Sequence, residues 1–253
     1  MEIDAYLEME ELENSHWWFV GRRKLINSLI NRNFDGFAID ILEIGCGTGG
    51  NLEMLSHYGS VTGIEMNVYA LGSAAASLNE SSPVILRQGF APHNLNLLDG
   101  AKFDLICMLD VLEHIPEDIE SLLVVKDLLK PGGKAIWTVP SYQWLWSAHD
   151  DFNHHKRRYT KRKLKQDLVS CGFQIDGAGY FNSFLFPIAA VARMLQKLLH
   201  VKTSKGVKMP NWMINKILKT IFSSERFISQ RSLFPFGLSI WALANEGRPT
   251  SKL

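Results

Sequence analysis

A glycine-rich turn follows the first strongly apolar segment of the chain, where residues 41–51 are ILEIGCGTGGN. Glycines directly after a buried strand allow a tight turn and let a ligand lie against the backbone, and the next helix offers its amide groups to an electron-rich ligand. The spacing Gly45-x-Gly47-x-x-Gly50 also fits a dinucleotide fingerprint, with Glu65 placed to accept ribose hydroxyls. The turn therefore predicts a nucleotide-containing cofactor without deciding which one.

Three further features separate the alternatives. Glu43 lies two residues before the first glycine, residues 109–115 are LDVLEHI after another apolar segment, and residues 128–133 are LLKPGG before the next. Together with the turn, these motifs resemble the class I S-adenosylmethionine-dependent methyltransferases, in particular the ubiquinone-type group (methyltransferase domains 11, 12 and 23). The resemblance implies S-adenosylmethionine as the cofactor and methyl transfer as the activity.

The resemblance also implies roles in cofactor binding. Glu43 is expected to hold the methionyl ammonium group, Glu65 to accept both ribose hydroxyls, and Met66 to pack on the adenine. The family often has an aspartate where this chain has Phe90, so stacking and backbone amides are expected to hold the adenine, although Phe90 could equally pack in the core. The expected cofactor-binding residues are Glu43, Gly45, Cys46, Gly47, Thr48, Gly49, Asn51, Glu65, Met66, Gly89, Phe90, Leu109 and Asp110.

Two histidines are candidates for removing a proton from an acceptor hydroxyl. Methyl transfer needs an in-line nucleophile, exclusion of water and, for a hydroxyl, loss of a proton. We expect His149 and His114 at the mouth of the sheet and favour His149 as the base. His114 could equally be a helix-start residue, and His149 could equally orient Asp150.

A divalent metal ion is the alternative use of these side chains. Glu113, His114 and His149 could gather with His154 or His155 around an ion that polarises an acceptor hydroxyl. Their spacing is not that of a ligand pair on one helix or strand. The sequence expectation is therefore that the site holds no metal.

Aromatic and basic side chains supply the candidates for acceptor binding. Residues 16–23 are HWWFVGRR, and seven bases lie between Lys156 and Lys165, as a solvated helix face or as a cradle for phosphate. A large subgroup of bacterial methyltransferases begins with a similar HWWF-x-GRR run and resembles this chain over nearly its whole length. The expected substrate-binding residues are Trp18, Arg22, Tyr142, Trp146, Arg157 and Arg158.

Alternating apolar segments and amphipathic helices must position these side chains. The pattern predicts an α/β fold with a doubly wound, Rossmann-like sheet. Seven strands are expected, with the last antiparallel, over residues 37–181 and 236–246. The predicted strands are 38–44, 60–65, 84–88, 103–109, 134–139, 173–180 and 237–244, and the predicted helices between them are 51–58, 68–78, 119–129 and 160–170.

Helical additions are expected at both ends of this core. Residues 1–36 should form a lid over the cofactor, with a solvated acidic helix over 2–13 and a second helix over 17–33, although the paired tryptophans could simply cap the core. Residues 182–235 hold nine Lys or Arg and one acid, and predict a basic amphipathic helical insertion. It could touch a membrane through residues 182–222 or pack as a cap on the active site. Residues 247–253 are expected to be a tail.

Composition narrows the functional class. The net charge is +1, so no nucleic-acid partner is expected, and three widely spaced cysteines favour a cytoplasmic protein, with peripheral contact at the inner face of the membrane an option. The expected reaction is O-methylation of a small acceptor or a lipid- or phosphate-linked one, such as a cell-surface saccharide intermediate. The alternatives are a nicotinamide-dependent nucleotide-sugar enzyme, which lacks its Tyr-x-x-x-Lys pair here, and a non-catalytic cofactor-binding scaffold.

Overall fold

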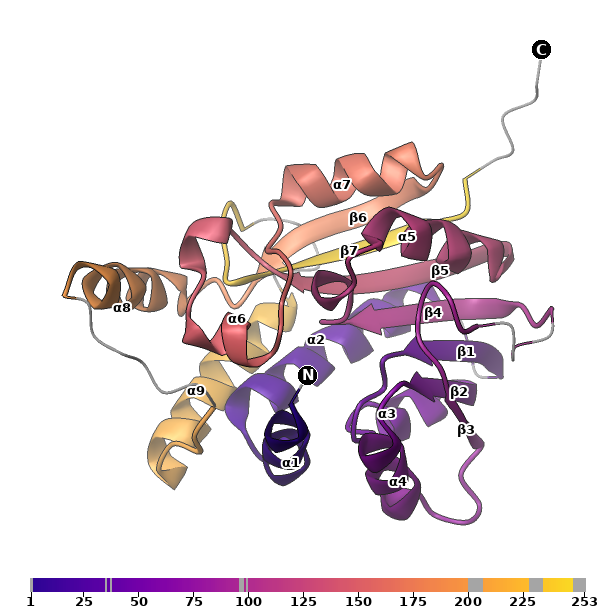
Figure 1. The fold of residues 1–253 in the computed structure, drawn as a ribbon, viewed down its shortest axis with the longest axis horizontal. Coiled ribbons are helices and arrows are strands. Elements are labelled where there is room, and N and C mark those ends of the chain that lie inside the picture. The colour runs from indigo at the N-terminus through magenta and orange to yellow at the C-terminus, as the bar shows by residue number, and fades with distance from the viewer. Residues whose placement is uncertain are drawn as a thin grey trace.

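A computed structural model describes residues 2–34, 36, 38–95, 98, 100–199, 207–227 and 234–247. Its centre is a seven-stranded sheet in the order β3-β2-β1-β4-β5-β7-β6 (Figure 1). The strands are β1 (Ile39–Ile44), β2 (Gly59–Glu65), β3 (Val84–Gln88), β4 (Phe103–Leu109), β5 (Leu129–Pro140), β6 (Gln174–Phe181) and β7 (Ser239–Asn245).

Strand direction follows the predicted pattern. β1 to β5 pair in parallel, whereas β7 runs antiparallel between β5 and β6. The fold class, a doubly wound sheet with an antiparallel last strand, is confirmed. The strand order reverses direction between β1 and β4, and open sheets of this kind bind ligands at the carboxyl ends of the strands next to such a reversal.

Helices cover both faces of the sheet (Figure 1). Two buried clusters result, one joining α5 and α7 to the sheet and one joining α2, α3 and α4 to the opposite face. Side chains of alternating strand residues supply them, so Ile136 faces α2 and Trp137 faces α7. The α-helices are α1 (Ile3–Leu12), α2 (Trp17–Asn33), α3 (Leu52–Ser56), α4 (Val68–Ser77), α5 (Asp118–Asp127), α6 (Ala148–Phe152), α7 (Lys161–Ser170), α8 (Phe186–Leu198) and α9 (Trp212–Ser224).

The largest boundary difference from the sequence expectation lies where α5 ends and β5 begins. α5 ends at Asp127, and the Lys-Pro-Gly-Gly segment that was expected to end a helix lies inside β5, where the register with β4 shifts. A bulge of this kind favours glycine: Gly132 has a φ of 81°, and a Cβ on Gly133 would lie 2.8 Å from the carbonyl oxygen of Phe103. The expectation of a fully solvated first helix is also wrong, because Tyr6 and Leu12 of α1 are buried.

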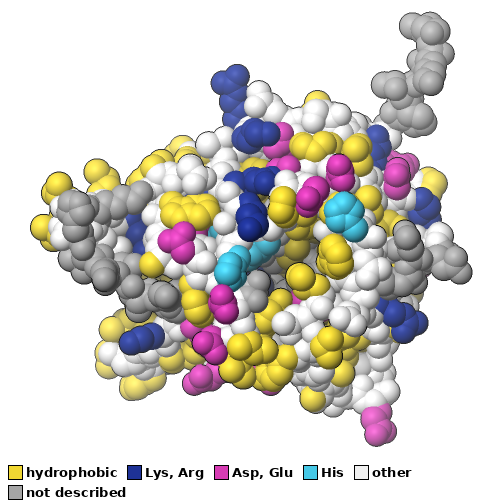
Figure 2. All heavy atoms as spheres, viewed as in Figure 1, with side chains coloured by type: hydrophobic (Ala, Val, Ile, Leu, Met, Phe, Trp, Pro, Cys, Tyr) yellow, Lys and Arg dark blue, Asp and Glu magenta, His cyan; other side chains and the backbone are white. Residues whose placement is uncertain are grey.

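The insertion contributes two helices to the described residues. α9 packs on α2: the side-chain oxygen of Asn215 accepts a hydrogen bond from the backbone amide of Trp17 at 2.8 Å, and Phe222 lies against Gly21. Both helices expose large apolar side chains, with Lys and Arg among them (Figure 2). None of the described helices is long and apolar enough to cross a bilayer. Lys202, Lys205 and Arg231, and residues 248–253 of the expected tail, lie outside the described residues.

Candidate active site

A cavity of about 1050 Å³ opens at the carboxyl ends of β1, β4 and β5. The glycine turn, α1, the start of α2, the segment after β4, α6 and α8 all contribute to its wall. On the face drawn in Figure 2, histidine and basic (Lys or Arg) side chains lie beside a hollow. The cavity thus brings together segments from both ends of the described chain, from Ala5 to Ser239.

Glu65 organises one end of this cavity. Its carboxylate accepts hydrogen bonds from the backbone amide of Gly47 at 3.0 Å, from that of Asn67 at 2.9 Å and from the hydroxyl of Tyr6 at 3.0 Å. The side chain is buried. Glu65 therefore ties the glycine turn to the end of β2, while its third partner comes from α1, which sequence reasoning placed in solvent.

Glu43 lies behind the glycine turn rather than on the cavity surface. One carboxylate oxygen accepts a hydrogen bond from the side-chain amide of Asn51 at 2.7 Å, and the other is buried without a hydrogen-bond partner. Burial raises the pKa of Glu43 to about 7. A buried, half-satisfied carboxylate beside a ligand-sized cavity is a site for a cationic group.

A second acid, Glu13, closes the turn from the side of α1. Its carboxylate accepts a hydrogen bond from the hydroxyl of Thr48 at 2.8 Å, and a Cβ on Gly50 would lie 2.3 Å from the same carboxylate. Gly50 is therefore needed for the approach of α1 as much as for the turn. This contact could not be predicted from the sequence, because Glu13 belongs to an acid-rich segment whose side chains are expected to be solvated.

Arg22 and Trp18 line the cavity from α2. The guanidinium of Arg22 pairs with Asp110 and lies 4.8 Å from the ring centre of Trp18. Asp110 is the first residue after β4 and has a φ of 60°, in the left-handed region that Asp adopts more readily than most other side chains. The ion pair thus holds α2 against the strand end at the middle of the cavity.

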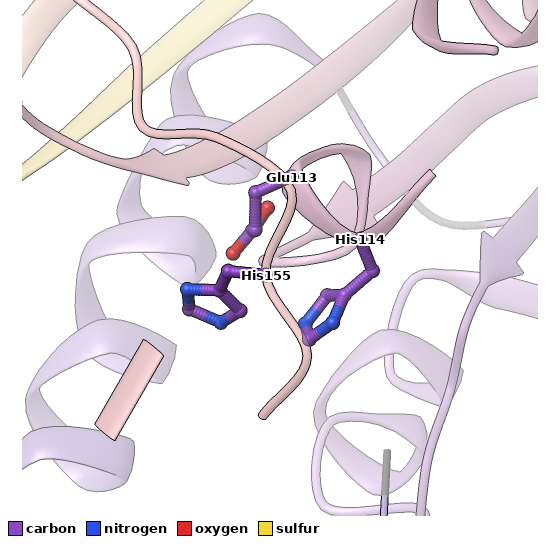
Figure 3. Close-up of side chains that lie close together, drawn as sticks. All are labelled: Glu113, His114 and His155. Atoms are coloured by element: carbon purple, nitrogen blue, oxygen red, sulfur yellow. The ribbon is translucent and has the colours of Figure 1, made fainter. Parts of the chain in front are cut away.

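Glu113, His114 and His155 meet at the other end (Figure 3). One ligand-type atom from each lies within 4.8 Å of the others. Glu113 is buried, and burial together with the nearby Asp110 raises the pKa of its carboxyl group well above the usual range. Burial, with His155 as a smaller cause, lowers the pKa of His114 to about 3.

His149 lines the same end of the cavity. Burial, followed by the neighbouring His155, lowers the pKa of His149 to about 4, so its ring is neutral near pH 7. Its ring nitrogens lie 3.1 and 3.2 Å from the side-chain amide nitrogen of Asn153. Asp150, which His149 might have oriented, instead accepts hydrogen bonds from His155 at 2.9 Å and from Arg158.

Comparisons with known proteins agree with this geometry. Residues 42–135 match the model of a family described as a methyltransferase domain. A ubiquinone biosynthesis O-methyltransferase of Paraburkholderia phymatum is 34% identical over 161 residues, covering 63% of this chain and 55% of that protein. These matches support membership of the class I S-adenosylmethionine-dependent methyltransferase superfamily. The chain spans about half the length of the curated relatives it matches, 40%, 47% and 55% for three of them.

Solved structures support the assignment at the level of the fold. Phosphoethanolamine N-methyltransferase 2 of Haemonchus contortus, in complex with phosphomonomethylethanolamine and S-adenosylhomocysteine, superposes with a TM-score of 0.58 at 16% identity over 88% of this chain and 53% of that one. A TehB-like S-adenosylmethionine-dependent methyltransferase of Corynebacterium glutamicum gives 0.52 at 15% identity over 89% and 86%.

The cavity fits the methyl donor of this superfamily. A Cβ on Gly45 would lie 2.5 Å from a methyl carbon of Val111, so only glycine lets the segment after β4 pack this closely on the turn. The unpartnered oxygen of Glu43 suits the methionyl ammonium, and Glu65 suits the ribose. Of the residues expected to bind the cofactor, those on the cavity wall are Gly45, Cys46, Gly47, Asn51, Glu65, Met66, Gly89, Phe90, Leu109 and Asp110.

Other expected residues have different surroundings. Glu43, Thr48 and Gly49 are absent from the described cavity wall, and Gly49 packs against Ala74 of α4. Of the expected substrate-binding residues, Trp18, Arg22 and Arg158 line the cavity. The other three make contacts elsewhere: Tyr142 stacks on Tyr180, the indole N–H of Trp146 donates a hydrogen bond to Asp151, and Arg157 forms an ion pair with Asp118. Many other wall residues were not predicted from the sequence, among them Tyr6, Met9, Glu13, Arg193 and Gln196.

Proposed function

We propose that this chain transfers the methyl group of S-adenosylmethionine to a hydroxyl oxygen of a small acceptor. The observation that carries the proposal is that one cavity contains both sets of groups. The glycine turn and Glu65 line one end of it, and His149 lies at the other. Its volume of about 1050 Å³ lies at the upper end of the ~300–1,000 Å³ range of small-molecule sites, so it has room for a donor and an acceptor together.

Different side chains of the cavity would bind the donor, exclude water and accept the proton. When bound, S-adenosylmethionine supplies an electrophilic methyl group. Glu65 binds its ribose, and the buried carboxylate of Glu43 attracts its amino group from behind the glycine turn. α1 and α2 exclude water, and His149 accepts the proton that the acceptor hydroxyl loses. The pKa of His149 keeps the ring neutral near pH 7 and therefore able to take that proton.

We propose that the acceptor carries a phosphate group on a lipid. Arg193 faces the cavity, and a guanidinium group can bind two phosphate oxygens at once. The Haemonchus contortus relative in fold binds a phosphate-bearing acceptor, phosphomonomethylethanolamine. α8, which contributes Arg193, lines the cavity with one face and exposes Ile188, Val191, Leu195 and Leu198 on the other.

We propose that this exposed face of α8, together with that of α9, rests on an anionic bilayer. Trp212, Met213 and Ile217 are each more than half exposed on α9. Residues 182–224 contain no Asp or Glu, so the charge of this surface is purely basic and complements anionic lipid. A lipid-linked acceptor held in the bilayer would thus meet the cavity along α8.

Cofactor choice tests the first proposal. Calorimetry should detect S-adenosylhomocysteine binding and none of NAD, and methyl transfer from labelled donor should then be measured across hydroxyl acceptors with and without phosphate. Binding of NAD in place of S-adenosylhomocysteine would reject the proposal outright, and transfer that ignores phosphate would remove the acceptor assignment alone.

Vesicle flotation tests the bilayer contact. The protein should float with anionic vesicles, and Ile188→Ser with Leu195→Ser should abolish flotation because both side chains lie on the exposed face of α8. Val169→Ser, which removes an exposed apolar side chain from α7, is the matched control and should float normally. Equal flotation of all three proteins would exclude α8 as the contact.

A further inference from the structure

The three side chains at the acceptor end of the cavity come from two separate segments. Glu113 and His114 belong to the short helix η2 (Leu112–His114), which follows β4, and His155 lies in the loop after α6. The backbone amide of Lys156 donates a hydrogen bond to the carbonyl of Glu113 at 2.7 Å. This contact joins the two segments directly beneath the cluster, so the three side chains are held together by the backbone.

Each histidine has a hydrogen bond that sets its ring. Nδ1 of His155 lies 2.9 Å from a carboxylate oxygen of Asp150, which is itself held by Arg158, and this contact leaves Nε2 of His155 as an acceptor. His114 interacts with the backbone of Asn153 and faces the His155 ring at a centroid distance of 4.6 Å. A carboxylate or carbonyl behind the ring is the usual support of a metal-bound histidine.

The carboxylate of Glu113 provides a second, independent observation. Its residue is 1% exposed, and Oε2 has no hydrogen-bond partner. Figure 3 shows this carboxylate directed toward the ring of His155. A buried carboxylate oxygen without a donor is costly unless a cation or a bound ligand satisfies it.

We propose that Glu113, His114 and His155 bind a divalent transition-metal ion. One carboxylate and two imidazoles suit Zn²⁺, Mn²⁺ or Fe²⁺ better than Mg²⁺, which prefers oxygen ligands. The three ligand atoms lie within 4.8 Å of one another. Small rotations of the side chains would bring each of the three ligand atoms to about 2.1 Å from one ion. All three residues line the cavity, so the remaining coordination positions face the acceptor.

The role of the ion rests on the proposed function, whereas its binding does not. Coordination of the acceptor hydroxyl would lower the pKa of that hydroxyl, and the proton would pass to His149, whose ring centre lies 6.4 Å from that of His155. The positive charge then stabilises the oxygen that attacks the methyl group. His114, considered above as a base, acts instead as a ligand.

Cobalt spectroscopy tests binding without any assay of activity. The full chain, stripped with EDTA and titrated with Co²⁺, should develop visible d–d absorption at one equivalent, and added Zn²⁺ should displace it. Glu113→Gln and His155→Ala should each weaken Co²⁺ binding at least about 100-fold. His154→Ala is the matched control, because that neighbouring histidine is exposed and pairs with Glu2, and it should bind Co²⁺ like the wild type.

Two further measurements separate the possible failures. S-adenosylhomocysteine binding by each stripped variant reports whether the fold and the cofactor end are intact. Equal Co²⁺ binding by the wild type, Glu113→Gln and His155→Ala, with the cofactor still bound, would overturn the metal site and leave the proposed function standing. Tight Co²⁺ binding without methyl transfer to any acceptor would keep the metal site and reject the proposed function.

Discussion

The two ends of the cavity are built in different ways. At the cofactor end, the groups on β1, β2 and their turns lie between Glu43 and Asn67, and local hydrogen bonds fix them. At the acceptor end, η2, the loop after α6 and α8 contribute side chains from Glu113 to Gln196. A site made by consecutive strand ends has a local sequence signature, whereas a site assembled from distant segments exists only in the fold.

The difference also separates the expected effects of mutation. Side chains at the cofactor end should control donor affinity, and those at the acceptor end should control turnover. Variants that affect both equally would show that the two ends act as one unit.

Replacement of His149 should give the largest effect on turnover. His149→Ala should lower kcat by about 10²–10⁴, because a general base contributes that much to a proton transfer. S-adenosylhomocysteine affinity, measured by calorimetry, should stay at the wild-type value. His57→Ala, at an exposed position after α3, is the control. Unchanged kcat in His149→Ala would remove His149 from the mechanism.

Glu65 should show the reverse behaviour. Glu65→Gln should weaken S-adenosylhomocysteine binding about 100-fold, because loss of the charge weakens two hydrogen bonds to the ribose by about 1.5 kcal/mol each. Calorimetry on this variant and on Glu80→Gln, which changes an exposed acid, measures the difference. Wild-type affinity in Glu65→Gln would show that Glu65 does not bind the ribose.

The pH dependence of cofactor binding should report on Glu43. Because burial raises its pKa to about 7, the carboxylate that attracts an ammonium group forms only as the pH rises through that value. S-adenosylhomocysteine affinity should therefore increase about tenfold from pH 6 to pH 8, and Glu43→Gln should flatten the profile. A profile unchanged in Glu43→Gln would assign the pH dependence to another group.

The stability of the free protein should fall as the pH rises, whereas the affinity for S-adenosylhomocysteine should increase. The folded state holds the Glu43 proton more tightly than the unfolded state, so this group lowers stability as the pH rises from 4.5 to about 7. The melting temperature of the wild type should fall relative to that of Glu43→Gln over this window.

The smallest expected effect concerns the attachment of the insertion. A Cβ on Gly21 would lie 2.3 Å from a ring carbon of Phe222, so Gly21→Ala should destabilise the protein by about 1–3 kcal/mol in urea unfolding. Gly72→Ala is the control, because nothing lies within 4 Å of its Cβ position in α4. Equal stabilities would mean that α9 packs loosely on α2.

Sequence reasoning succeeded where the chain makes its own local pattern. The bounds of β3, β4 and α2 match the expectation fully, since apolar runs and helix periodicity depend on neighbours in sequence. The partners of Glu65 and Glu43 on the glycine turn follow from the same local signal. Tyr6 and Glu13 were missed because an acidic helix is expected to be solvated until its partner is known. The sequence offered the meeting of Glu113 with His154 or His155 only as an alternative, because the contact joins two segments that are far apart in the chain.

The hydroxyl of Tyr6 occupies one of the two oxygens of Glu65 in the free protein. A ribose hydroxyl that bonded the same oxygen would compete with this phenol, so donor binding at Glu65 would exchange one hydrogen bond for another. The contact between α1 and the end of β2 would then weaken when the donor binds, which would link the position of the first helix to the occupancy of the cavity.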